Sequence, residues 1–179
     1  MARVPYVDLS ESEGQSELAE LYSTLAGLRG SVHNLQRSLA NQPAALRAFM
    51  GMSHYVRDES SLAPRLRELA VLATAYVHDV PYEIHYHVPA ARRAGVSEEE
   101  LAAFPDWTAA EVFDATERAV LSYADQVARR LEVDDATFEV LRSHLSLVEI
   151  VDLVLTVAWY QLCAAVIVPL QIEADPRHP

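Results

Sequence analysis

The dominant feature of this sequence is a helical spacing of apolar residues that continues along almost the whole chain. The segment 15–28 shows it most simply. Its large apolar side chains are Leu18, Leu21, Tyr22, Leu25 and Leu28. Residues three or four positions apart share one face of an α-helix, whereas a half-buried strand alternates at every second position. Because no such alternation is found in the 179 residues, the spacing predicts an all-α fold.

Helix-starting and helix-stopping residues divide the chain into about eight helices and one short helical stretch. Proline is tolerated in the first turn of a helix, serine and aspartate cap helix starts, and glycine often follows the last helical residue. The expected helices cover residues 15–28, 32–40, 43–57, 64–78, 81–94, a short stretch after Ser97, 108–131, 134–144 and a long stretch from Ser146. No linker or low-complexity segment interrupts them, so we expect one domain over residues 1–179.

Charge and cysteine content exclude several classes of function. Acidic residues outnumber basic ones by 26 to 14, giving a formal net charge of −12, and such a surface repels nucleic-acid phosphates. Every basic residue in that count is arginine, which excludes lysine Schiff-base chemistry and the lysine of phosphate-binding loops. Cys163 is the single cysteine. It allows no CxxC redox pair and no cysteine zinc site, and we interpret it as a small core residue.

The segment 153–170 is nearly all apolar and has the length of a membrane span. It contains Thr156 and Gln161, follows Asp152, and has no arginine cluster beside it. We therefore expect a core helix and no membrane partner. Its apolar residues cover nearly the whole helix circumference, so we also expect a second copy of the chain to bury part of it. The N-terminus lacks the apolar core of a secretory signal, which favours the cytoplasm.

Histidine and glutamate side chains gather in the segment 65–95. Glu83 and His87 are four residues apart and share a helix face. Glu68 lies on the preceding helix, which a short connection near Asp79 places beside the next one. A carboxylate fixes the tautomer of a histidine and raises its basicity. These three residues are the candidates for proton-transfer chemistry.

Two other interpretations of these residues stay open. A Glu–His pair at this spacing on an exposed face is only a weak helix-stabilising contact. His85, His87 and a carboxylate could bind a metal ion. However, side chains two residues apart diverge on a helix, so no metal site is expected.

The motifs around these residues resemble the carboxymuconolactone decarboxylase family, which shares its helical fold with alkylhydroperoxidase D. The matching motifs are Arg-x-x-Glu-Leu at Arg65–Leu69, Tyr-Glu-x-x-x-His at Tyr82–His87, and the Ala-Gly-x-Ser segment at Ala94–Glu99. The resemblance covers most of residues 35–172 and leaves 1–34 as an N-terminal helical extension. It implies an alkylhydroperoxidase D-like fold and assembly into trimers or hexamers.

The chain departs from the peroxidase branch of this family at the redox centre. In that branch a CxxCxxxH motif supplies a dithiol. Aligned on His87, the cysteine positions hold Val80 and Glu83, while Glu68 falls at the branch's upstream glutamate. Thiol peroxidase chemistry needs a thiolate and a resolving thiol, so an antioxidant activity is the weakest alternative. Pro89, inside the same helix, is expected to kink it.

The resemblance therefore implies an enzyme that performs proton transfer on a small cyclic or lactone acid without a dissociable cofactor, either a decarboxylase or a related lyase or isomerase. His87 is expected to donate the proton, with Glu83 and Glu68 setting its charge state. The residues expected to contact the substrate are Arg65, Arg67, His85 and Tyr82. Further candidates for the pocket lining are Asn34, His54, Tyr55, Trp159 and Tyr160. The alternative is a non-catalytic helical oligomer, which would leave the candidate residues in solvent.

Overall fold

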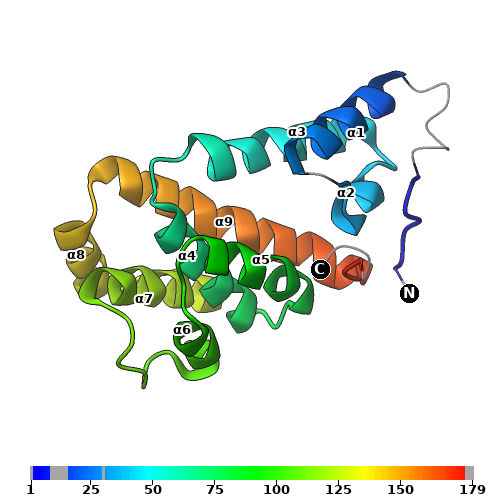
Figure 1. Ribbon diagram of the computed structural model, residues 1–179. Coiled ribbons are helices and arrows are strands. Elements are labelled where there is room, and N and C mark those ends of the chain that lie inside the picture. The colour runs from blue at the N-terminus through cyan, green and yellow to red at the C-terminus, as the bar shows by residue number, and fades with distance from the viewer. Residues whose placement is uncertain (1, 9–15, 30, 176–179) are drawn as a thin grey trace.

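The computed structural model describes residues 2–8, 16–29 and 31–175, and every regular element in these ranges is a helix (Figure 1). The α-helices are α1 (Ser16–Arg29), α2 (Asn34–Leu39), α3 (Pro43–His54), α4 (Pro64–Val77), α5 (Pro81–Arg93), α6 (Glu98–Ala103), α7 (Ala115–Arg130), α8 (Asp135–His144) and α9 (Leu147–Leu170). A π-helical turn, η2 (Tyr55–Glu59), follows α3, and a 3₁₀ turn, η3 (Phe104–Asp106), follows α6. The all-α prediction is confirmed.

Most helix starts coincide with the capping residues that the sequence predicts. Ser97 and Ser146 form capping boxes with the glutamates three residues later, and Asp134 caps α8. These side chains satisfy backbone N–H groups that have no partner inside the helix. The prolines at the starts of α3, α4 and α5 lie in the first turn, where a missing N–H costs nothing.

The helix predicted over 108–131 is shorter in the structure and begins at Ala115. Asp114 ends the preceding loop, because its carboxylate accepts from the Glu117 backbone N–H at 2.8 Å while Glu117 accepts from the Asp114 N–H at 2.9 Å. This reciprocal capping box fixes the helix start. The side chain of Leu28, which belongs to the predicted stripe of the first helix, lies outside the described residues.

The helix predicted over 43–57 ends as an α-helix at His54 and continues as the π turn η2. The Ser60 backbone N–H donates to the Tyr55 carbonyl at 2.9 Å, five residues back. A π turn fits one more residue into the turn than an α-helix does, so it rotates the side chains that it carries, and such turns are frequent at functional sites.

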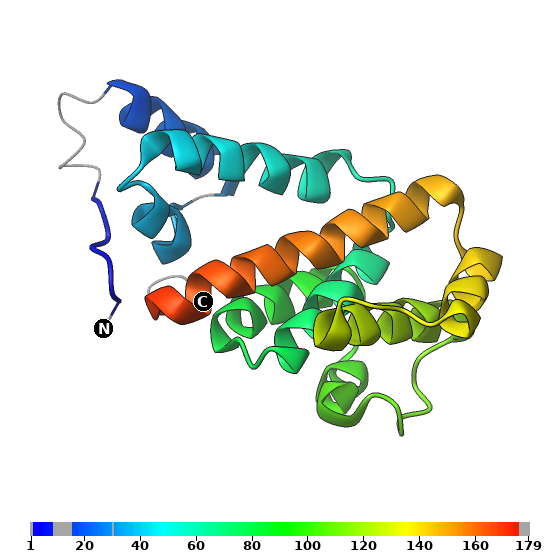
Figure 2. The same ribbon diagram turned by 180° about the vertical axis from the view of Figure 1, so that it is seen from behind.

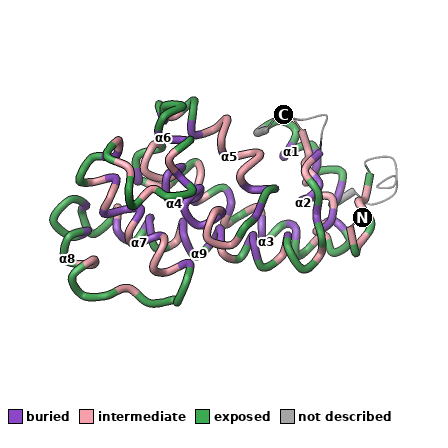
Figure 3. Tube along the Cα trace, turned by 90° about the horizontal axis from the view of Figure 1, so that it is seen from below, coloured by how far each residue is buried: buried purple, intermediate pink, exposed green. Residues whose placement is uncertain are grey.

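The central helix of the fold is α4, which packs against α5, α7 and α9. All eight residues from Glu68 to Ala75 are buried. The largest core cluster joins α4 to α7 and to the first half of α9, and Figure 3 shows buried residues gathered where these helices lie, with α6 and α8 largely exposed. A polar residue of α4 is therefore either enclosed by protein or held at the edge of a cavity.

The N-terminal helices lie on the other side of α9 from the α4, α5 and α7 group (Figures 1 and 2). Phe49 of α3 packs on Trp159 of α9 with ring centroids 4.3 Å apart. The second core cluster, which contains both rings, also buries Val56 of η2. This packing places the π turn against α9 and next to the start of α4.

Helix α9 is long and apolar enough to cross a membrane by length and composition alone, but a core helix passes the same test, and 44% of its most apolar stretch is buried inside the structure. Several of its large apolar side chains are exposed. They are Leu147, Val148, Val151, Val154, Leu162 and Val168. Burial of this surface by a second copy of the chain stays a prediction.

Candidate active site

His87 of α5 lies at the centre of a buried charged cluster. Its side chain is 1% exposed. Its Nδ1 atom is 2.7 Å from Oε2 of Glu68, and its Nε2 atom is 3.3 Å from Oε2 of Glu83. Both glutamates are themselves buried. The three residues singled out by the sequence thus lie together inside the protein, which excludes the weak contact on an exposed helix face.

Arg57 of η2 completes this cluster and was not identified from the sequence. Its Nη2 atom is 3.3 Å from Nε2 of His87, and its backbone carbonyl accepts from Nη1 of Arg67 at 3.0 Å. No spacing rule connects a residue thirty positions upstream with His87. The only signal is the run of polar residues that interrupts the third helix, and its π-helical geometry is a product of the packing on α9.

The π turn that carries Arg57 is attached to α9 by Asp152. The Tyr55 hydroxyl donates to Oδ1 of Asp152, and the Ser61 backbone N–H donates to Oδ2, each at 2.6 Å. Asp152 is 2% exposed, and hydrogen bonds to a charged acceptor are among the stronger ones in proteins. Because the two bonds lie on either side of the turn, they fix the backbone from which Arg57 extends.

The cluster shifts the pKa values of its two central groups toward an ion pair. Burial alone lowers the pKa of His87, but the charge and hydrogen bond of Glu68 and the contact with Glu83 outweigh it and raise the pKa above its ordinary 6.5. Burial alone raises the pKa of Glu68, but His87, Arg57 and Arg67 outweigh it and lower the pKa below its ordinary 4.5. A protonated His87 beside an ionised Glu68 is therefore the favoured state between the ordinary pKa values of the two groups, about pH 4.5 to 6.5.

The two partners of Nε2 allow His87 to gain and lose a proton without losing its contacts. A protonated ring donates from both nitrogens, to Glu68 and to Glu83. A ring that has lost the proton from Nε2 accepts there from Arg57, which lies 3.3 Å away. A histidine with a partner for each state is suited to proton transfer.

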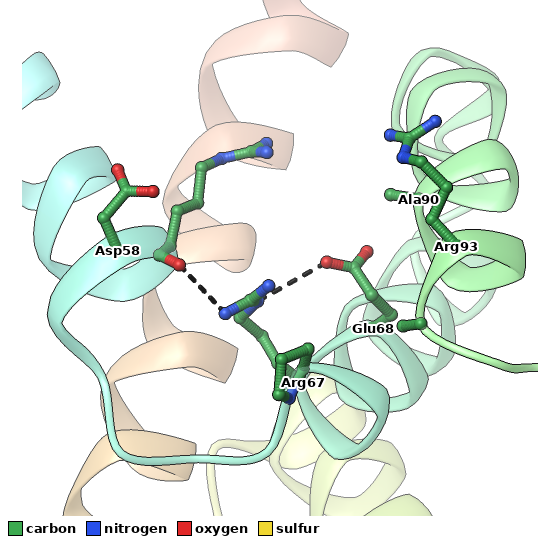
Figure 4. A pocket seen from close by; sticks show the side chains of 8 residues that line it. Asp58, Arg67, Glu68, Ala90 and Arg93 are labelled. Carbon is green, nitrogen blue, oxygen red and sulfur yellow. Dashed lines mark hydrogen bonds and ion pairs between the residues drawn. The ribbon is translucent and has the colours of Figure 1, made fainter. Parts of the chain in front are cut away.

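A cavity of about 320 Å³ opens beside this cluster (Figure 4). It is lined by Arg57, Asp58, Pro64, Arg67, Glu68, Ala90, Arg93 and Ala94. In Figure 4, Asp58 and Arg93 stand on opposite sides, with Arg67 and Glu68 between them. His87 is not among the lining residues. Glu68 is therefore the member of the Glu68–His87 pair that meets a molecule in the cavity, whereas the sequence predicted that His87 would meet it.

The residues predicted to contact a substrate fall into different places. Arg67 lines the cavity, and its Nε atom is 3.4 Å from Oε1 of Glu68. Arg65 points elsewhere and uses all three guanidinium nitrogens within the protein: Nε donates to Glu117 at 2.6 Å, and the other two bond Glu100 and the Gly95 carbonyl. The position of Arg65 gives no support to a role in substrate binding.

The other two predicted contacts also lie outside the cavity lining. The Tyr82 hydroxyl accepts from the Leu35 backbone N–H at 3.2 Å, so this buried tyrosine ties α5 to α2. The half-buried His85 packs edge-on against Tyr86, with ring centroids 4.8 Å apart. Tyr160 of α9 does reach the cluster, since its ring meets the His87 ring edge-on at a centroid distance of 4.8 Å. Burial raises the pKa of Tyr160, which keeps the phenol neutral.

Within the described residues, no group of three or more His, Cys, Asp or Glu side chains is placed to hold a metal ion. Cys163 is a buried cysteine on α9, whereas His87 lies on α5. The chemistry that the arrangement itself supports is proton movement between Glu68 and His87.

Residues 43–126 match the carboxymuconolactone decarboxylase family, and no curated protein matches the chain. The chain is similar to a solved peroxidase-related protein with an alkylhydroperoxidase AhpD core from Ralstonia eutropha JMP134, with 21% identity over 99% of this chain and 94% of that one and a TM-score of 0.84. It is also similar to a protein of unknown function from Agrobacterium tumefaciens that carries the name AhpD, with 26% identity, coverage of 76% and 94%, and a TM-score of 0.72.

A third solved structure is a variant of the debrominase Bmp8 in complex with 2,3,4-tribromopyrrole. Its identity with this chain is 15%, over 97% of this chain and 91% of that one, and the TM-score is 0.82. At this level of identity the likeness shows the fold alone.

Proposed function

Since residues 43–126 match the carboxymuconolactone decarboxylase family and the chain has the AhpD-like all-α fold, we propose that it is an enzyme that transfers a proton to or from carbon in a small organic acid. The observation that carries the proposal is the buried Glu68–His87 pair, 2.7 Å apart, with Glu68 at the edge of a cavity. Perturbed titratable groups beside a cavity are typical of active sites.

In the proposed decarboxylation, the bond between a ring carbon and a carboxylate breaks, carbon dioxide leaves, and the electron pair forms a dienolate. A carbon of the dienolate then takes one proton. Glu68, which is ionised at the start, first takes a proton from Nδ1 of His87 and then delivers it to that carbon, and solvent later returns a proton to the histidine. Arg67, which lines the cavity beside Glu68, stabilises the negative oxygen of the dienolate. An isomerase would use the same groups, with Glu68 first removing a proton.

The distribution of thiols argues against a peroxidase. The positions that correspond to the redox dithiol hold Val80 and Glu83, and Glu83 instead contacts the histidine. The debrominase complex with 2,3,4-tribromopyrrole supports the idea that this fold can hold a small ring compound. A non-catalytic scaffold is less consistent with this cluster, because Glu68 lines a cavity and the buried Nε atom of Arg57 has no acceptor among the described residues.

The test is a ligand screen followed by a reaction in heavy water. Small cyclic carboxylic and lactone acids are added to the protein, and an acid that binds the folded state raises the melting temperature. Incubating that acid with the protein in D₂O should yield a product with one deuterium bound to carbon, detected by NMR. If stabilising acids are recovered without carbon-bound deuterium or any other change, the chain is not this enzyme.

We also propose that the chain forms a homo-oligomer through α9. Leu147 is 72% exposed and Val148 is 60% exposed, and contiguous apolar surface of this kind usually marks an interface. The family resemblance favours a trimer or hexamer. Sedimentation should therefore give a multiple of 19.9 kDa, and Val151→Asp should reduce it to the single-chain mass. A monomer of the unaltered protein at micromolar concentration would contradict the proposal.

A further inference from the structure

The cavity beside Glu68 carries more positive than negative charge. Three of its lining residues are arginines, and two are carboxylates. Both carboxylates are already engaged: Asp58 accepts from His54 at 2.9 Å, and Glu68 contacts His87 and Arg67. This excess is set against a formal net charge of −12 for the whole chain, so a general basic surface does not explain it.

Two of the three arginines have no ion-pair partner in the described part of the chain. Arg67 pairs with Glu68, but no described carboxylate lies within ion-pair distance of Arg57 or Arg93. The Nε atom of Arg57 is buried and lacks any hydrogen-bond acceptor among the described residues. A buried donor without an acceptor is costly and rare in folded proteins. The charges of Glu68 and Glu83 stabilise the Arg57 guanidinium from a distance, but no described residue supplies the acceptor that its Nε atom lacks.

The space around Arg93 is open because its neighbours in the cavity wall are small. Ala90 and Ala94 lie three residues before and one residue after it on the α5 side, and both line the cavity. Arg93 itself is exposed and extends from the wall opposite Asp58 (Figure 4). An anion that enters the cavity would meet Arg93 at the mouth and Arg57 nearer to His87.

We propose that Arg57 and Arg93 bind a carboxylate group of a small organic acid and thereby hold the acid against Glu68. This inference deepens the proposed function, on which it rests for the role of Glu68. Guanidinium groups match the geometry of a carboxylate and pair with it more specifically than an ammonium group does. A volume of about 320 Å³ is at the small end of ligand pockets, which limits the acid to a single ring or a short chain.

The carboxylate that the two arginines hold is a group of the acid that does not react. A carboxylate held by two arginines is stabilised as an anion, so it resists departure as neutral carbon dioxide. The carbon that exchanges a proton with Glu68 therefore lies elsewhere in the acid. If the reaction is a decarboxylation, the acid carries a second carboxylate that the two arginines do not hold.

The experiment compares carboxylates with their neutral amides by calorimetric titration at pH 7. The probes are acetate, cyclopentanecarboxylate and benzoate, each with its matched amide. We expect at least one carboxylate to bind about tenfold tighter than its amide, the size expected for hydrogen bonds to a charged group. If none of the six probes binds, or if acids and amides bind equally, the proposal fails.

Arg93→Gln should lower the affinity for the carboxylate about fivefold and leave the affinity for the amide unchanged. The matched control is Arg92→Gln, which removes the neighbouring charge from α5. Arg92 pairs with Glu98 at 2.6 Å and does not line the cavity. If the control weakens carboxylate binding as much as Arg93→Gln does, the effect belongs to the general field of the protein and the proposal is wrong.

Arg57→Gln tests the inner arginine, with a melting curve to check that the variant folds. The readout is again the ratio of carboxylate to amide affinity, which a merely structural role would not change, and Arg57→Lys should restore part of it. A ratio unchanged by Arg57→Gln contradicts the role of Arg57. Because binding is measured without turnover, selective carboxylate binding combined with no proton transfer would overturn the proposed function alone.

Discussion

Two charged clusters with buried carboxylates lie three residues apart on α4, one around Arg65 and one around Glu68. In the Arg65 cluster every guanidinium nitrogen has an acceptor. Its two carboxylates, Glu100 and Glu117, also accept from the backbone N–H groups of Ser97 and Asp114 as parts of capping boxes. This cluster joins α4 to the starts of α6 and α7, and none of its three side chains lines the cavity beside Glu68.

The Glu68 cluster is built from the same kinds of residue but is left incomplete. One arginine nitrogen has no acceptor in the described structure, the histidine nitrogen Nε2 lies between two partners, and a cavity opens on one side. The comparison teaches that charge and burial alone do not identify a site. What distinguishes a site is that its polar groups are not all satisfied by the protein.

The first and largest test of this comparison exchanges one carboxylate in each cluster for its amide. Glu68→Gln removes the group that meets the substrate, so kcat should fall by about 10²–10⁴-fold, the usual contribution of general acid–base catalysis. Glu117→Gln is the matched control and should leave kcat per folded molecule within about twofold, while lowering the melting temperature. Equal losses of activity in the two variants would remove the distinction between the clusters.

The second test measures stability in the Arg65 cluster. Arg65→Gln leaves Glu100 and Glu117 buried without their partner, and breaking a buried ion pair costs about 3–5 kcal/mol. Because the Arg65 side chain is 29% exposed, we expect a loss near the lower end, about 3 kcal/mol, and a fall in melting temperature of about 6–12 °C. Arg92→Gln, which breaks an exposed pair, should cause no measurable change. A melting temperature unchanged by Arg65→Gln would mean that this cluster is not structural.

The third test uses pH, because the clusters titrate differently. His87 has a raised pKa, so its contribution to stability is complete below about 6.5 and is lost as the pH rises through the raised value. Glu68 has a lowered pKa, so its contribution is complete above about 4.5 and is lost as the pH falls through the lowered value. The pair should therefore stabilise the fold most between about pH 4.5 and 6.5.

The Arg65 cluster should lose stability only in acid. Burial alone raises the pKa of Glu100, but the Ser97 N–H and Arg65 outweigh it and lower the pKa, while arginine stays charged at high pH. Melting temperatures from pH 4 to 9 for the protein, for the double variant Glu68→Gln with His87→Gln, and for Arg65→Gln separate the two patterns. If the advantage over the double variant does not decline above pH 7, the raised pKa of His87 is not supported.

Much of the fold was readable from the sequence because its signals are local. Ser97 with Glu100 and Ser146 with Glu149 are complete start signals within four residues, and both helices begin where predicted. The prediction was wrong at 108–114, where helix-compatible residues precede the stronger signal of Asp114 with Glu117. It also missed the π turn, since Tyr55 and Ser61 take their geometry from Asp152, some ninety residues away.

The candidate site was predictable where helix spacing governs it and not elsewhere. Four-residue spacing and a short connection were enough to bring Glu83, His87 and Glu68 together. To predict which arginine contacts the substrate, one must know which way each side chain points. Arg65 and Arg67 are two residues apart on α4 and therefore point in different directions, and only Arg67 lines the cavity. Arg57 reaches the cluster through the π turn, so its position depends on tertiary packing that no local pattern encodes.

The smallest expected effect is that of Cys163→Ser, which asks whether the Glu68 cluster needs a thiol. Cys163 is buried on α9 and lies within electrostatic range of Arg57, so proximity alone does not separate it from the cluster. Proton transfer between Glu68 and His87 involves no sulfur, and we expect kcat and KM to change by less than about twofold. Stability should fall modestly, because a hydroxyl replaces a weakly polar thiol in the core. A steady-state assay measures kcat and KM, and a melting curve measures stability. Glu68→Gln serves as the inactive reference. If the activity needs added thiol reductant and disappears in Cys163→Ser, Cys163 is a redox-active residue and the Glu68 cluster supports its chemistry instead of proton transfer to carbon.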